Sequence, residues 1–82
     1  MKEDLDMECI KKMLEELRPE FNFDESENFI EDGLLDSFDV VSLITMIEEN
    51  FQVSIDGMDI VPENFVDYKS ILSLIQKSGA EI

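Results

Sequence analysis

The sequence contains no histidine, no tryptophan and a single cysteine, Cys9. Without histidine the chain has no Ser-His-Asp triad, no Cys-His pair and no histidine-based metal site. Its three glycines form no glycine-rich phosphate loop. Cys9 has no partner for an internal disulfide, which fits a reducing compartment. Its place among apolar helix positions favours a small buried side chain over a reactive thiol.

Basic residues are also scarce. Six lysines and arginines face 21 aspartates and glutamates, for a formal net charge of −15. Such a surface repels nucleic acid and anionic membranes, and it attracts basic patches on partner proteins. We therefore expect no nucleic-acid partner. Apolar residues still make up 44% of the chain, which distinguishes it from a disordered acidic tail.

Long apolar runs are absent. No stretch approaches the roughly 20 apolar residues that span a bilayer. The acidic start, residues 1–6, does not resemble a secretory signal peptide. We therefore expect a cytoplasmic protein without a membrane span. The length of 82 residues allows one small core, so residues 1–82 are expected to form a single domain and a monomer.

Apolar residues at helical spacing predict three main helices. The first covers about residues 4–17 and ends at Arg18-Pro19, because a residue before proline is disfavoured in a helix. The second covers residues 37–50, with Asp36 or Ser37 as its cap. The third follows Asp67, its expected N-cap, and stops at Gly79.

The connections between these helices complete the predicted fold. Residues 19–36 are too apolar for a loose linker and should pack on the core. Residues 52–55 alternate in polarity, but four residues are too few to build a sheet. Residues 58–65 contain Pro62 and predict a short helical turn or two. The expected fold is therefore all-α, an antiparallel four-helix bundle of three main helices and one short helix.

A calcium loop is one possible use of the acidic residues. The pattern Asp24-x-Ser26-x-Asn28 begins like an EF-hand loop. Its sixth position is Phe29, where the sharp turn needs glycine, and its twelfth is Leu35, where a bidentate glutamate is needed. We therefore predict no metal site. An enzyme that acts through paired carboxylates is disfavoured as well, because nothing in the sequence predicts an apolar cleft around them.

The remaining chemical feature is Ser37, which stands between Asp36 and Asp39 at the start of the second helix. Spacing alone favours an ordinary capping serine in an acidic helix. The alternative is an attachment site, because a helix N-terminus favours an anion such as a phosphate ester on Ser37.

The segment Asp36-Ser37-Phe38-Asp39 resembles the Asp-Ser-Leu-[Asp/Glu] signature of the acyl carrier protein family. Residues 29–35 resemble the family's loop before the modified serine, and residues 47–51 resemble the end of its second helix. Residues 61–65, followed by Ile71, are similar to its third-helix region. The resemblance therefore covers nearly the whole chain.

The resemblance implies a 4′-phosphopantetheine arm on Ser37, with Asp36 and Phe38 beside it, placed there by a phosphopantetheinyl transferase. The thiol of the arm would hold the cargo as a thioester, so the chain would be a non-catalytic carrier. The implied partners also include an acyl- or aminoacyl-loading ligase and a downstream transferase or synthase with basic docking surfaces. An acidic helical adaptor without a prosthetic group is the alternative.

Two departures from the fatty-acid type bear on the cargo. Gly33-Leu34-Leu35 replaces the commoner Leu-Gly-x before the Asp-Ser pair, and Phe38 replaces leucine. Both resemble D-alanyl carrier proteins and the aminoacyl or peptidyl carriers of peptide synthetases. Fatty acyl, malonyl, D-alanyl and other aminoacyl cargoes all stay open.

The second helix has two predicted faces. The core face comprises Val40, Leu43, Ile44, Ile47 and Phe51. By resemblance, the stripe that docks onto partner enzymes comprises Asp36, Phe38, Asp39, Val41, Thr45 and Glu48. Two of these residues have alternative structural roles: Phe38 could instead cover the loop, and Val41 could belong to the core.

Overall fold

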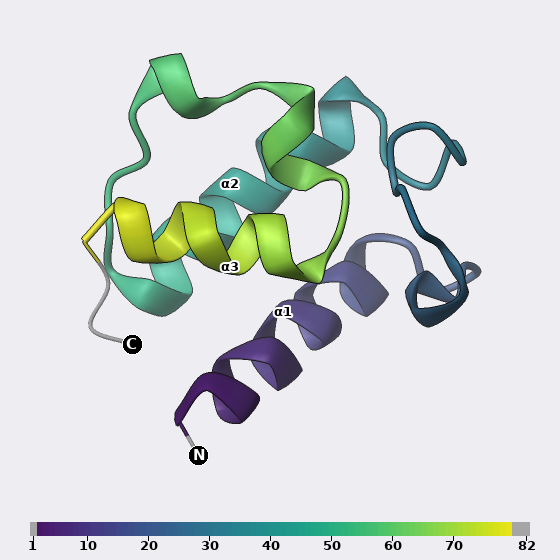
Figure 1. The fold of residues 1–82 in the computed structure, drawn as a ribbon, viewed down its shortest axis with the longest axis horizontal. Coiled ribbons are helices and arrows are strands. Elements are labelled where there is room, and N and C mark those ends of the chain that lie inside the picture. The colour runs from purple at the N-terminus through teal and green to yellow at the C-terminus, as the bar shows by residue number, and fades with distance from the viewer. Residues whose placement is uncertain (1, 80–82) are drawn as a thin grey trace.

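The computed structural model describes residues 2–79, with side chains described for residues 6–79. Its framework is three α-helices, α1 (Lys2–Leu17), α2 (Ser37–Phe51) and α3 (Tyr68–Lys77). In Figure 1, α1 leads away from the N-terminus and α2 runs back in the opposite direction. No strand occurs between residues 2 and 79. The all-α prediction is confirmed, and the first two helices begin and end within two residues of their predicted bounds.

The expected fourth, short helix is not confirmed. Residues 57–65 instead form two 3₁₀ turns, η2 (Gly57–Asp59) and η3 (Pro62–Phe65), with Val61 extended at φ −128° and ψ 151°. Proline disfavours the helical region for the residue before it, and Pro62 has no N–H group to continue a helix from η2. The third such turn, η1 (Phe23–Glu25), lies in the first connection.

The core lies where the apolar stripes of the three helices meet. Each helix contributes two of the fully buried side chains, and two phenylalanines from the connections complete the set: Ile10, Leu14, Leu43, Ile47, Ile71, Ile75, Phe29 and Phe65. Burying each of these side chains stabilises the fold by about 1.5–3 kcal/mol before entropy costs. The three helices are therefore held together by one small apolar centre.

The connection between α1 and α2 packs on this core, as its composition predicts. Phe23, Phe29 and Leu35 are buried. The Phe29 ring makes edge contacts with Phe23 and with Tyr68 of α3, at centroid distances of 5.0 and 5.2 Å. The long loop is therefore anchored immediately before α2 begins.

A turn at Gly33 completes this anchor. Gly33 has φ +76°, a conformation that glycine adopts without steric cost. Beyond the turn, the N–H groups of Leu34 and Leu35 both donate to the Phe29 carbonyl, at 2.9 and 3.1 Å. These bonds fix the backbone that leads into Asp36, and so they set where the first turn of α2 points.

Candidate functional site

The first turn of α2 is closed by a reciprocal pair of hydrogen bonds. Asp36 is the N-cap, and its carboxylate accepts the Asp39 N–H at 2.9 Å. The Asp39 carboxylate in turn accepts the Asp36 N–H at 3.2 Å. This arrangement satisfies two N–H groups at the helix start. Of the two caps that the sequence allowed, the structure uses Asp36, which leaves Ser37 as the first residue of the helix.

The two residues after the cap face solvent. Ser37 is exposed, and 84% of Phe38 is exposed. Because the Phe38 ring is exposed, it does not contribute the stabilisation that burial in the core would give. The hydroxyl of Ser37 is therefore accessible to another protein, with an unburied phenyl ring next to it.

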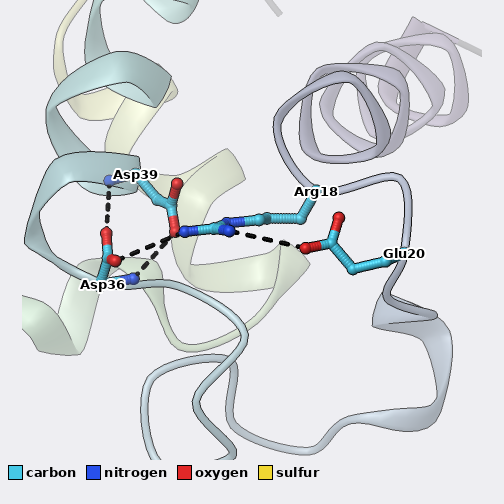
Figure 2. Close-up of polar contacts among 4 residues, drawn as sticks. All are labelled: Arg18, Glu20, Asp36 and Asp39. Atoms are coloured by element: carbon cyan, nitrogen blue, oxygen red, sulfur yellow. Dashed lines mark hydrogen bonds and ion pairs between the residues drawn. The ribbon is translucent and has the colours of Figure 1, made fainter.

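Asp39 faces the other way, into the molecule. It is only 8% exposed, and its Oδ2 accepts a hydrogen bond from Arg18 Nε at 2.9 Å. Figure 2 shows Arg18 extending from the end of α1 toward the carboxylates of Asp36, Asp39 and Glu20. A buried carboxylate is costly unless it is paired and hydrogen-bonded. Arg18 supplies the pairing, so Asp39 is not available to contact a partner enzyme.

The ion pairs between Arg18 and its neighbouring carboxylates favour the charged forms of Arg18 and Asp36. Arg18 Nη2 lies 3.4 Å from Asp36 Oδ2, and Arg18 Nη1 lies 3.5 Å from Glu20 Oε2. The hydrogen bond to Asp39, followed by its charge, raises the pKa of Arg18. The Asp39 N–H and the charge of Arg18 lower the pKa of Asp36. Arg18 and Asp36 therefore both stay charged at neutral pH.

An apolar groove of about 280 Å³ runs beside Ser37. One wall comes from α2 and the loop before it, and the other from the segment between η2 and η3. The lining residues are Ile30, Leu35, Asp36, Ser37, Val40, Val41, Ile60, Val61 and Pro62. Val40, which the sequence placed on the core face, is only partly buried because it lies at this groove. The site thus joins an accessible hydroxyl to an apolar surface.

A larger cleft of about 530 Å³ lies elsewhere on the molecule. Residues of α1, the following loop and α3 line it, among them Lys12, Glu16, Phe21 and Tyr68, but not Ser37. The Tyr68 hydroxyl in this cleft donates a hydrogen bond to Asp24 at 2.9 Å. The larger volume therefore does not coincide with Ser37, which lines the smaller groove.

Three residues of the predicted docking stripe do share the outer face of α2. Phe38, Val41 and Thr45 follow one another at spacings of three and four residues, and all are exposed. Val41 is 61% exposed, which excludes it from the core. Thr45 Oγ1 donates to the Val41 carbonyl at 3.3 Å, so its hydroxyl is paired within α2.

Glu48, the last member of that stripe, has a local structural contact. It is half-buried, and its carboxylate accepts the backbone N–H of Ile55 at 3.0 Å. This bond ties the end of α2 to the extended segment that follows. The sequence prediction missed the contact because a glutamate within an amphipathic helix normally faces water.

Arg18 was also missed as a site residue. The sequence marked it only as the end of α1, yet it is the single arginine of the chain. Its partners Asp36 and Asp39 lie 18 and 21 residues away. The one sequence feature that could have drawn attention to Arg18 is that it is the single arginine in a strongly acidic chain. Periodicity reports which side of a helix a residue occupies and carries no information about such distant pairing.

The other chemical groups do not assemble into a second site. Among the residues that the structure describes, no group of three or more potential ligands could hold a metal ion. Within residues 2–79, no helix combines the length and the apolar character needed to cross a membrane. Cys9 is partly buried against the core, and burial, followed by the charge of Asp6, raises the pKa of its thiol. Cys9 therefore behaves as a small apolar side chain.

Comparison with known protein families identifies the class. The family model for the phosphopantetheine attachment site matches residues 7–77, which include all three helices apart from the first residues of α1. The chain therefore belongs to the phosphopantetheine attachment site family. The prosthetic group of this family is covalently attached 4′-phosphopantetheine. Searches of curated proteins and of solved structures gave no match.

Proposed function

We propose that the protein is a free-standing acyl or aminoacyl carrier whose arm is attached to the hydroxyl of Ser37. The observation that supports this most directly is the exposure of Ser37 at the first residue of α2, beside the apolar groove. The groove suits the apolar parts of an arm or a small cargo, because it buries them next to the attachment point. The family match supports the same chemistry.

The chain's own part in this function is presentation. When bound, the arm supplies a thiol that holds the cargo as a thioester. The Ser37 oxygen would form the new phosphoester bond as the pyrophosphate bond of coenzyme A breaks. Adenosine 3′,5′-bisphosphate would leave, and the hydroxyl proton would pass to the transferase. Asp36 fixes the backbone beside that oxygen through its cap. Carrier domains of this family are generally non-catalytic, so partner enzymes carry out each reaction.

The partners we propose are a phosphopantetheinyl transferase, an acyl- or aminoacyl-loading ligase and a downstream transferase or synthase. Phe38, Val41 and Thr45 form the contact face, with the charged Asp36 at its edge. The net charge of −15 favours partners with basic grooves, and it would speed their encounter at low salt. The proposed setting is the cytoplasm. The resemblance of Phe38 and Gly33-Leu34-Leu35 to D-alanyl and peptidyl carriers supports an aminoacyl cargo such as D-alanyl.

Intact-mass measurement tests the attachment. The wild-type protein, incubated with coenzyme A and a broad-specificity transferase, should gain one arm. Ser37→Ala should gain none. Ser42→Ala is the matched control, because Ser42 is also exposed on α2, and it should load like the wild type. Circular dichroism establishes that both variants are folded. A wild type that stays unmodified would contradict the proposal and favour the adaptor without a prosthetic group.

A further inference from the structure

Arg18 joins two parts of the chain at the turn that presents Ser37. Its guanidinium uses all three nitrogen atoms, because Nε contacts Asp39, Nη2 contacts Asp36 and Nη1 contacts Glu20. Arg18 directly follows α1, whereas Asp36 and Asp39 belong to the start of α2. Figure 2 shows the side chain bridging the space between these two elements. One cation therefore connects the end of α1 to the first turn of α2.

A single oxygen atom couples this ion pair to the helix cap. Asp39 Oδ2 accepts both Arg18 Nε, at 2.9 Å, and the Asp36 N–H, at 3.2 Å. Without Arg18, the buried carboxylate of Asp39 would have no cation beside it among its described contacts. Its burial would then be uncompensated, and turning toward water would lower the free energy of the charged group. Turning toward water would break its bond to Asp36, the residue directly before Ser37.

We propose that Arg18 is a positioning residue for arm attachment: it holds the Asp36–Asp39 pair in the geometry that orients the Ser37 hydroxyl toward the transferase. This inference rests on the proposed role of Ser37. Arginine suits the task because its planar fork can serve several carboxylates at fixed angles, whereas lysine presents one compact charge.

The charge of the arm adds a second reason for a cation here. Attachment places an anionic phosphodiester on Ser37, in the same turn as the carboxylates of Asp36 and Asp39. Like charges in one turn repel, in a chain whose net charge is already −15. The guanidinium of Arg18 offsets part of that repulsion, so its removal should make loading less favourable as well as less well oriented.

Transferase kinetics on purified variants test the role of Arg18. Arg18→Gln should lower kcat/KM for loading on the order of tenfold, because misplacing a reacting group slows the chemical step. The loss should fall mainly on kcat. Lys77→Gln is the matched control: it also removes one positive charge and breaks an ion pair, with Asp59 at 2.8 Å, in the last turn of α3. It should load within about twofold of the wild type, since no reacting group moves.

A double variant shows whether Arg18 acts through Asp39. In an Asp39→Asn background, the side chain at position 39 needs no cation and can still accept the Asp36 N–H. Arg18→Gln should then cost much less than in the wild type, which is the non-additivity expected of a coupled pair. The same tenfold loss in both backgrounds would overturn the positioning role, because Arg18 would then contact the transferase directly.

Folding is checked separately by circular dichroism at the assay temperature. A folded Arg18→Gln variant that loads within twofold of a loadable wild type would overturn the inference. If Arg18→Gln does not fold, Arg18→Lys is tested in its place. Its kcat/KM for loading should fall about threefold, because the lysine ammonium lacks the planar guanidinium that contacts several carboxylates. Wild-type rates for Arg18→Lys would overturn it too. An unloadable wild type would instead overturn the proposed function, so the two failures are distinguishable.

Discussion

The helices α2 and α3 begin with the same hydrogen-bonding device in two different settings. Each has an aspartate N-cap that accepts the N–H of the residue three positions later, Asp36 from Asp39 and Asp67 from Ser70. In each, that later side chain bonds back to the N–H of the cap. In α3 the returning group is a neutral hydroxyl. In α2 it is a buried carboxylate, which needs Arg18 beside it.

The residue after each cap differs as well. Tyr68 of α3 is half-buried, packs against Phe29 and donates its hydroxyl hydrogen to Asp24 at 2.9 Å. Ser37 of α2 is exposed beside an apolar groove. The residue after the α3 cap therefore packs against the core, whereas the residue after the α2 cap presents a hydroxyl to solvent. A helix cap alone does not make a site, because accessibility and charge around it decide what the cap can do.

Beyond their first turns, α2 and α3 should contribute to folding stability in the same way through their buried side chains. Core substitutions in either helix should have the largest effect of those predicted here. Ile47 of α2 and Ile71 of α3 are both fully buried. Replacing either with alanine should destabilise the protein by roughly 2–5 kcal/mol, since each change leaves a cavity in the core. Urea unfolding measures both, with the exposed Thr45→Ala as control. A loss at Ile47 no larger than that at Thr45 would show that α2 does not pack as described.

The aromatic residues at the two helix starts should separate stability from function. Tyr68→Ala should destabilise by about 1–3 kcal/mol, because it removes ring packing and the bond to Asp24. Phe38→Ala should change stability by no more than about 0.5 kcal/mol, because the ring is exposed. It should nevertheless impair loading or transfer. Thermal melts and transferase assays on both variants test the contrast, and unfolding of Phe38→Ala would place its ring in the core.

The charged cap of α2 should respond to acid. The pKa of Asp36 is lowered in the folded state by the Asp39 N–H and then by Arg18. Its stabilisation is therefore present above the unfolded pKa of about 3.9 and is lost as the pH falls through the lower folded value. Asparagine retains the cap without the charge. The stability difference between wild type and Asp36→Asn should shrink from pH 7 to pH 3 in urea unfolding. A difference that widens on acidification would contradict the charge-based cap.

The sequence predicted the two helices and their caps better than it predicted the turns and the long-range contacts around them. The bounds of α2 and the caps at Asp36 and Asp67 follow from local patterns, which depend on neighbours within a few residues. For residues 58–65 the sequence predicted a short helical turn or two, counted as one short helix in the fold. The two 3₁₀ turns stay separate because Pro62 keeps Val61 extended.

The long-range contacts were beyond such patterns. Asp39 was expected on a docking surface, but its pairing with Arg18 spans 21 residues and turns it inward. Spacing along one helix cannot report a cation delivered by another. Conversely, helical spacing placed Phe38 and Val41 on the outer stripe, with a loop-covering or core position as the alternative, and both are exposed. Local patterns thus placed Ser37 at the start of α2, the family resemblance singled it out, and tertiary packing determines which residues surround it.

Peptide mapping of the loaded protein tests the central contrast most directly, because both helix starts carry a serine. Trypsin cleavage after Lys69 places Ser70 and Ser37 on separate peptides. After incubation with coenzyme A and transferase, fragmentation mass spectrometry should find the arm on Ser37 alone. Ser70→Ala should load fully and a folded Ser37→Ala not at all. An arm on the Ser70 peptide, or a folded Ser37→Ala protein that is still modified, would contradict the assignment of the α2 start as the attachment site.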